Sequence, residues 1–236
     1  MSFDPKLAQK ELEDLNCIIQ DYYTATCAVM FKYRTVDPYD LFLYSCGHSL
    51  TLLPIAENLE GMPNTRVTII EKETAVFEQV KEILTTGNRF IDLHNGGCDK
   101  LARIIGGLSY GRTHNGMLLL DLNGLVDWSF LAELFSLRNK HLFRFEVAIH
   151  FSATTHKRHL DEKISECAAS ISKSKWFCTE MYRGRHQWLT LVGTQWDRNP
   201  TSGVLYPISL ENGKWVMCRA DNTVKQLAEL QEENEQ

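Results

Sequence analysis

Two polar side chains close the most apolar run in the chain, which reads GMLLLDLN at residues 116–123. The four apolar residues at 117–120 favour a buried parallel strand, because such strands are covered on both faces. Asp121 and Asn123 follow this run, and open α/β sheets bind their ligands beyond the carboxyl ends of their strands. Both residues are therefore candidate catalytic groups. Asp and Asn also end strands because they form good turns, so a purely structural role stays open beside the catalytic one.

The surrounding sequence alternates apolar strands with amphipathic helices, which predicts an α/β fold with a mostly parallel sheet. The expected strands lie at residues 41–44, 66–70, 89–93, 117–120 and 145–151, and the helices that follow them lie at about 49–59, 73–84, 99–105, 127–137 and up to about 172. Two further strands, 176–182 and 187–193, are separated by only four residues, so they should form an antiparallel hairpin. A second small hairpin is expected from residues 204–208 and 215–218.

The two ends of the chain differ from this alternating core. Asp4 and Pro5 form a good helix start, and apolar residues then recur at helical spacing, so we expect residues 1–37 to form an N-terminal helical extension. Residues 38–220 would form the α/β domain. Asp221 is placed to cap a last helix, and residues 221–236 are expected to form this C-terminal helix and a polar, frayed tail.

Composition limits the class of protein. With 236 residues, 44% of them hydrophobic, the chain can bury one sizeable core, and it contains no run of about 20 apolar residues that would cross a membrane. The charged N-terminus is unlike a signal peptide. Seven cysteines without a C-x-x-C pair argue against a disulfide framework or a zinc site and favour reduced thiols. We therefore expect a cytoplasmic protein, in the host cytosol if a phage encodes it, with no metal.

Five strand–helix units followed by a hairpin resemble the class I S-adenosylmethionine-dependent methyltransferases, whose Rossmann-like sheet is mostly parallel, seven-stranded and ends in an antiparallel hairpin. The resemblance implies that S-adenosylmethionine binds at the turn of Ser45, Cys46 and Gly47. It implies that Glu71 accepts hydrogen bonds from the ribose hydroxyls and that Asn95 lies near the adenine ring. A structural glutamate at the end of its strand and a simple flexible turn at residues 94–97 are the alternatives.

The same resemblance implies roles at the fourth strand. In amino-group methyltransferases, an Asp or Asn at the positions of Asp121 and Asn123 accepts a hydrogen bond from an exocyclic amine and orients its lone pair toward the methyl group. The usual Pro-Pro-aromatic continuation is absent, so Trp128 would have to supply a stacking face, or else it anchors its helix on the sheet. His150 in the fifth strand is expected to be a hydrogen-bonded core or edge histidine rather than a base.

Positive charge gathers in one part of an acidic chain. Residues 138–198 hold eleven Lys and Arg against six Asp and Glu, a net +5, although the whole chain carries −5. Lys157 and Arg158 follow the fifth strand, and Arg183 and Arg185 lie in the hairpin turn between two aromatic residues. These four cations are candidate nucleic-acid contacts, because basic side chains beside aromatic ones suit a nucleic-acid strand. An ordinary solvated surface is the alternative.

Three blocks of sequence carry a more specific resemblance: LLLDLNGLVDWSFLAEL, IHFSATTHKR and YRGRHQWLTLVGTQW. They resemble the three-Cys-motif partner proteins of the shorter, phage type, over roughly residues 40–208. The family looks like class I methyltransferases, and the resemblance implies modification of DNA or a related substrate. The family has Asp-Pro where this chain has Asp121-Leu122, and more glycine in its first turn. Two functions therefore stay open: a methyltransferase acting on nucleic acid or a nucleotide, and a non-catalytic module that binds nucleic acid or protein.

Overall fold

The computed structural model of the chain describes residues 5–32, 38–87, 91–108, 115–121, 134, 145–152, 159–171, 173–181, 187–196, 199, 201, 203–218 and 224–227. The strands are β1 (Tyr39–Ser45), β2 (Thr65–Glu71), β3 (Asp92–Asn95), β4 (Asn115–Asp121), β5 (Phe145–Ser152), β6 (Lys175–Cys178), β7 (Trp188–Thr194), β8 (Tyr206–Glu211), β9 (Lys214–Cys218) and β10 (Val224–Gln226). The helices are α1 (Pro5–Lys32), α2 (Ser49–Glu60), α3 (Thr74–Gly87), α4 (Cys98–Gly106) and α6 (Leu160–Ser170).

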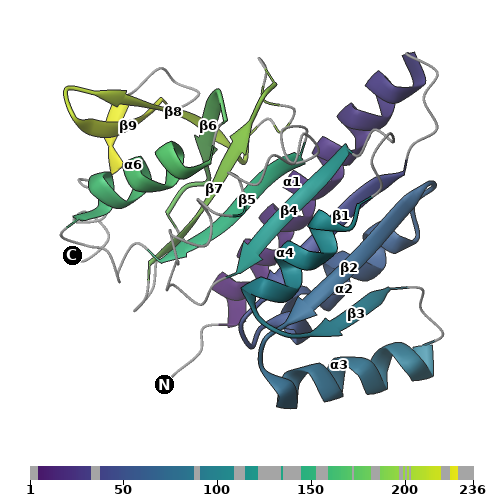
Figure 1. Cartoon of the computed structure of the whole chain (residues 1–236). Coiled ribbons are helices and arrows are strands. Elements are labelled where there is room, and N and C mark those ends of the chain that lie inside the picture. Colours follow the sequence, from purple (N-terminus) through teal and green to yellow (C-terminus); the bar gives the residue numbers. More distant parts are fainter. Residues whose placement is uncertain are drawn as a thin grey trace.

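The described strands form one twisted sheet in the order β10-β9-β8-β6-β7-β5-β4-β1-β2-β3 (Figure 1). Strands β3, β2, β1, β4 and β5 are mutually parallel, and β7 is antiparallel to both β5 and β6. This confirms the mixed sheet in which a hairpin follows the parallel part, and it places the first and fourth strands side by side. The seven strands from β3 to β6 have the Rossmann-like methyltransferase arrangement predicted from the sequence.

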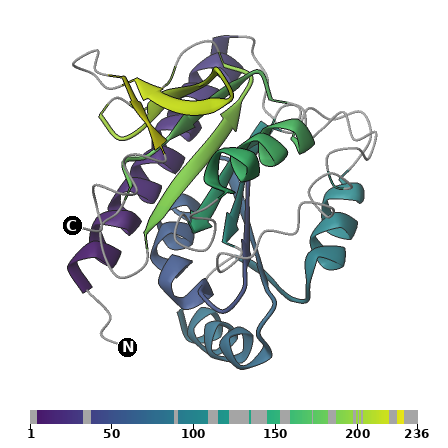
Figure 2. The same ribbon diagram turned by 90° about the vertical axis from the view of Figure 1, so that its left-hand side faces the viewer.

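Helices cover both faces of the sheet, as Figure 2 shows with the sheet seen near its edge. Apolar residues of α1, α2 and α3 pack with one face, and those of α4 and α6 pack with the other. Leu15, Ile18, Ile19 and Tyr22 of α1 are at most 3% exposed. The N-terminal helix therefore forms part of the core over the sheet, although the sequence suggested an extension outside the α/β domain.

The carboxyl ends of the parallel strands bring the polar residues into one row. The strand registers pair Asn95 with Glu71, Glu71 with Ser45, Ser45 with Asp121, and Asp121 with His150. The amide of Cys46 also donates a hydrogen bond of 3.2 Å to the carbonyl oxygen of Asp121. The first turn and the end of β4 thus lie at the same edge of the sheet, as predicted.

Three sequence predictions need correction. The sheet has ten described strands rather than seven, because β8 joins β6 and extends it with β9 and β10. Residues 224–226 are strand β10 and not part of a helix from Asp221, since they pair with the edge of β9 and satisfy its backbone groups. Asn95 lies within β3, where the sequence predicted a loop at 94–97. Among the described helices, none is long and apolar enough to cross a membrane.

Candidate functional site

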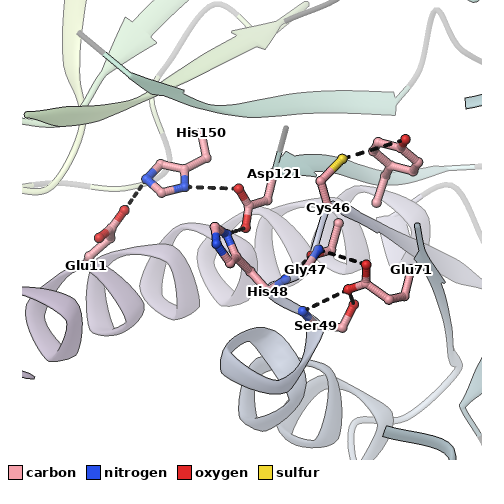
Figure 3. A network of polar contacts seen from close by, with 10 residues as sticks. Glu11, Cys46, Gly47, His48, Ser49, Glu71, Asp121 and His150 are labelled. Carbon is pink, nitrogen blue, oxygen red and sulfur yellow. Dashed lines mark hydrogen bonds and ion pairs between the residues drawn. The ribbon is translucent and has the colours of Figure 1, made fainter. Parts of the chain in front are cut away.

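Four ionisable side chains form a continuous chain of contacts at the carboxyl edge of the sheet (Figure 3). The Nδ1 atom of His48 lies 2.7 Å from Oδ2 of Asp121, and Nδ1 of His150 lies 3.5 Å from Oδ1 of the same carboxylate. The second ring nitrogen of His150 forms an ion pair with Glu11. Asp121 is thus held between two histidines, and His150 is held between two carboxylates.

Each member of this chain comes from a different element. Asp121 ends β4, and His150 lies beside it because the two residues are partners in the parallel ladder between β4 and β5. His48 ends the turn after β1, directly before the first residue of α2. Glu11 comes from α1, which lies over this part of the sheet. Residues that are far apart in the sequence therefore meet because of the sheet order and the position of α1.

Exposure differs along the chain of contacts. The side chain of Asp121 is 4% exposed, those of His150 and Glu11 are 13% and 17% exposed, and that of His48 is 41% exposed. Among the described residues, the ring of His48 has only one polar partner, Asp121, which uses its Nδ1 atom. His48 is therefore the member of the four that can contact a ligand, and the buried Asp121 holds the inner nitrogen of its ring.

The pKa values follow from this arrangement. Burial opposes the charge of Asp121, but hydrogen bonds from His150 and His48 hold its pKa well below the usual range. Burial also opposes the charge of His150, yet its bonds to Asp121 and Glu11 prevail and raise its pKa to about 9. The hydrogen bond to Asp121 raises the pKa of His48 as well, against burial. His150 is consequently a cation at neutral pH, and it balances one of its two carboxylate neighbours.

The chain of contacts forms the polar wall of a cavity of about 180 Å³. Leu12 and Leu15 of α1 and Leu52 of α2 supply an apolar wall, and Trp188 of β7 closes another side. The indole of Trp188 packs against the ring of His150, with centroids 4.6 Å apart and planes inclined at 34°. Within the described part of the chain, no lysine or arginine lines this cavity. The cavity therefore suits an uncharged, partly apolar group better than a phosphate.

Glu71 ends β2 at this edge, and its side chain is bonded to other residues of the chain. Its side chain is completely buried, and its two oxygens accept four hydrogen bonds from the chain itself. The amides of Gly47 and Glu73 donate to Oε1 at 2.8 and 2.7 Å, and the amide and hydroxyl of Ser49 donate to Oε2 at 3.2 and 2.6 Å. Since a carboxylate offers about four lone-pair sites, all of these positions are in use. A ribose hydroxyl could bond to Glu71 only by displacing one of these four donors.

The remaining amides of the first turn are also used internally. The amide of His48 donates to the hydroxyl of Ser45 at 2.9 Å, and that of Cys46 donates to the last carbonyl of β4. Gly47 has a φ of +98°, a conformation that glycine adopts easily, so this one glycine is what the turn requires. Four successive amides of this turn, at residues 46–49, are thus hydrogen-bonded inside the protein.

The outer part of this edge is more open. Asn95 lies at the exposed end of β3 and donates a hydrogen bond of 3.2 Å from its side chain to the carbonyl oxygen of Glu71. The thiols of Cys46 and Cys98 both lie against the hydroxyl of Tyr44, at 3.8 and 3.3 Å. These contacts tie β3 to the end of β2, and the first turn and the start of α4 to Tyr44 of β1. The cofactor roles given to Ser45, Cys46, Gly47 and Asn95 remain predictions.

Sequence reasoning found the edge but not the whole site. Ser45, Cys46, Gly47, Glu71, Asn95 and Asp121 all lie along it, as predicted. The other candidates lie outside the described residues: Asn123, Lys157, Arg158, Arg183 and Arg185. Glu11 and His48 were not considered, and His150 was assigned to the core or edge. His48 could have been found from its position in the turn after β1, whereas nothing in the sequence linked Glu11 to this edge.

No protein-family model matches the chain, and no curated protein matches it. Solved structures of similar fold include a human methyltransferase 10 domain containing protein (13% identity, 68% of this chain and 73% of that one, TM-score 0.44). A methyltransferase from Pyrococcus furiosus is 16% identical, with 72% of this chain and 82% of that one covered and a TM-score of 0.40. The O-methyltransferase TomG from Streptomyces achromogenes, in complex with S-adenosylmethionine, is 14% identical, with 83% of this chain and 92% of that one covered and a TM-score of 0.46. Similarities at this level concern the general fold alone.

Proposed function

We propose that this chain is a methyltransferase-like enzyme that acts on a nucleic acid or a nucleotide, and that its acceptor group enters the cavity beside His48. The observation that supports the proposal is the chain of contacts from Glu11 through His150 and Asp121 to His48, which ends on an accessible imidazole in a cavity. A buried carboxylate behind an accessible histidine is an arrangement for moving protons.

In this proposal His48 is the general base that removes a proton from the acceptor group of the ligand. Asp121 accepts a hydrogen bond from Nδ1–H of His48, which leaves the lone pair of Nε2 for an N–H or O–H of the ligand. Because Asp121 raises the pKa of His48, it also increases the affinity of that ring for the proton it receives. A general base placed in this way contributes about 10²- to 10⁴-fold to a rate. Asp121 thus acts through His48, where the sequence had suggested direct contact with an amine.

The lining of the cavity indicates which part of a nucleotide would enter. The described lining carries two carboxylates and two histidines but no lysine or arginine, so a phosphate would meet net negative or neutral charge. An uncharged heterocyclic base has an apolar face for the leucines and for Trp188, and a protic edge for His48. We therefore expect the base to enter the cavity and the phosphates to remain outside it, where the cations predicted at residues 157, 158, 183 and 185 would bind them.

One observation favours a second function, a non-catalytic binding module that has kept the fold and lost the cofactor turn. The four hydrogen bonds on Glu71 and the internally bonded amides of residues 46–49 leave neither this carboxylate nor these amides free for S-adenosylmethionine. In this function the cavity would still bind a base. The two functions therefore differ in whether the methyl donor S-adenosylmethionine binds, and they share the base that enters the cavity.

Isothermal titration calorimetry on the full chain separates the two functions. The enzyme is expected to bind S-adenosylmethionine and S-adenosylhomocysteine, and also neutral nucleosides. The binding module is expected to bind a nucleoside and neither of the two sulfur compounds. His48→Ala should weaken nucleoside binding, whereas His94→Ala, which changes a histidine outside the cavity lining, should leave it unchanged. If none of the common nucleosides binds, the assignment of the cavity to a base is wrong.

A further inference from the structure

The helix α1 supplies both a charge and a wall to the Asp121 site. Glu11 contacts the ring nitrogen of His150 that faces away from Asp121. The cavity is lined by Leu12, the next residue of the helix, and by Leu15, one turn further along. We propose that Glu11 is a positioning residue that fixes the ring of His150 toward Asp121, and that α1 is a functional part of this site whose attachment to the sheet is coupled to occupation of the cavity. The second half of this proposal rests on the proposed function.

The contacts of His150 leave its orientation dependent on Glu11. Trp188 packs against one face of the ring, and this contact does not distinguish the two ring orientations that differ by a half-turn about the Cβ–Cγ bond. The distance from His150 to Asp121 is 3.5 Å, at the outer limit of a hydrogen bond, so this contact alone holds the ring weakly. The ion pair with Glu11 holds the opposite side. Two carboxylates on opposite sides require a doubly protonated ring, and that state has one orientation that satisfies both.

Among the described residues, the titratable groups near His150 come from three separate segments. Asp121 comes from β4, Glu11 from α1 and His48 from the turn before α2, while Trp188 from β7 is uncharged. Asp121 is the only carboxylate among the described residues that contacts both histidines. If His150 loses its charge, Asp121 loses one cationic neighbour and attracts the proton of His48 more strongly. A change at Glu11 is therefore transmitted to the accessible end of the site.

The helix is anchored independently of Glu11. Ile18, Ile19 and Tyr22 are buried in the core over the sheet, and the hydroxyl of Tyr23 donates a hydrogen bond of 2.8 Å to the carbonyl oxygen of Pro63. Removal of the Glu11 charge should therefore change the site without releasing α1. Conversely, a ligand in the cavity touches α1 directly and binds only when the N-terminal half of the helix is in place. By linkage, the ligand must stabilise that half of the helix.

Imidazole NMR on the full, ligand-free chain tests the role of Glu11 without any assumption about the ligand. Glu11→Gln is expected to lower the titration midpoint of His150 by about one unit or more and to raise that of His48, because an opposite charge in contact shifts a pKa by about that amount. Glu13→Gln, which removes a charge from an exposed position of the same helix, should move neither midpoint. If Glu11→Gln does not fold, Glu11→Asp should give a smaller shift of the same sign. An unchanged His150 midpoint in the folded variant overturns the positioning role.

Hydrogen exchange tests the coupling of α1 to the cavity. A saturating nucleoside is expected to slow the exchange of amides at residues 11–19 in the natural chain, and to leave exchange in α3, which lies away from the cavity, unchanged. Binding of the nucleoside without added protection of α1 would overturn the coupling while leaving the proposed function intact. Absence of nucleoside binding would instead overturn the proposed function and with it the coupling, and the NMR result for Glu11 would still stand.

Discussion

Replacing Glu71 by glutamine separates the two roles that this residue could have. The resemblance implied that Glu71 holds the ribose of a cofactor, whereas the structure shows both its oxygens bonded to the first turn and to the start of α3. Glutamine has the same shape but replaces one acceptor oxygen with an N–H₂ donor. If that group faces Ser49, the hydroxyl can turn to accept a hydrogen bond, but the amide of Ser49 loses its acceptor.

The expected cost follows from these contacts. A buried donor without an acceptor costs about 1–3 kcal/mol, and each hydrogen bond that changes from a charged to a neutral acceptor loses about 1 kcal/mol. One orphaned amide, together with weakened bonds to Gly47 and Glu73, gives a loss of about 4 kcal/mol in the free energy of unfolding. That is a large part of the stability of an ordinary domain, so Glu71→Gln should be clearly destabilised.

Urea denaturation followed by circular dichroism measures this loss, with Glu73→Gln as the matched control because the side chain of Glu73 is exposed and two residues away. Calorimetry with S-adenosylhomocysteine is run on the same proteins. A turn-holding role predicts a loss of about 4 kcal/mol in Glu71→Gln and little change in the control. A loss below about 1 kcal/mol, together with weaker cofactor binding, would refute the argument and restore the ribose role.

Three further outcomes are expected. The pKa of His150 is raised from its ordinary 6.5 to about 9, so its charge should stabilise the fold fully below pH 6.5. About 3 kcal/mol of the free energy of unfolding should be lost as the pH rises from there through 9. Denaturation of His150→Gln across the same pH range should lack that loss. Gly116→Ala would place a Cβ atom 1.9 Å from a backbone oxygen of β1, so it should lose about 4 kcal/mol or more, or fail to fold, whereas Gly106→Ala meets nothing within 4 Å and should melt near the temperature of the natural chain. If Arg183 and Arg185 contact phosphates, glutamine at both should flatten the log–log salt dependence of nucleic-acid binding by about two units, and an unchanged slope would assign both to the solvated surface.

Much of the fold was determined by local patterns in the sequence. The apolar run before Asp121 is a strand because it is continuous and short, and the short spacing before Trp188 permits only a hairpin connection. Parallel strands place their carboxyl ends at one edge, so the gathering of Ser45, Glu71 and Asp121 could be predicted from the order of the strands along the chain. These features depend on residues close in sequence and on a general rule of α/β sheets.

The identity of the neighbours at that edge depended on tertiary structure. Glu71 looks the same in the sequence whether it faces a ribose or the amides of its own turn, since only the fold decides which donors reach its oxygens. His150 is an ordinary strand residue until β4 places Asp121 beside it and α1 places Glu11 on its other side. Local sequence patterns set the backbone, but the partner of a buried charge is set by contacts between distant segments, and these depend on how the whole chain packs.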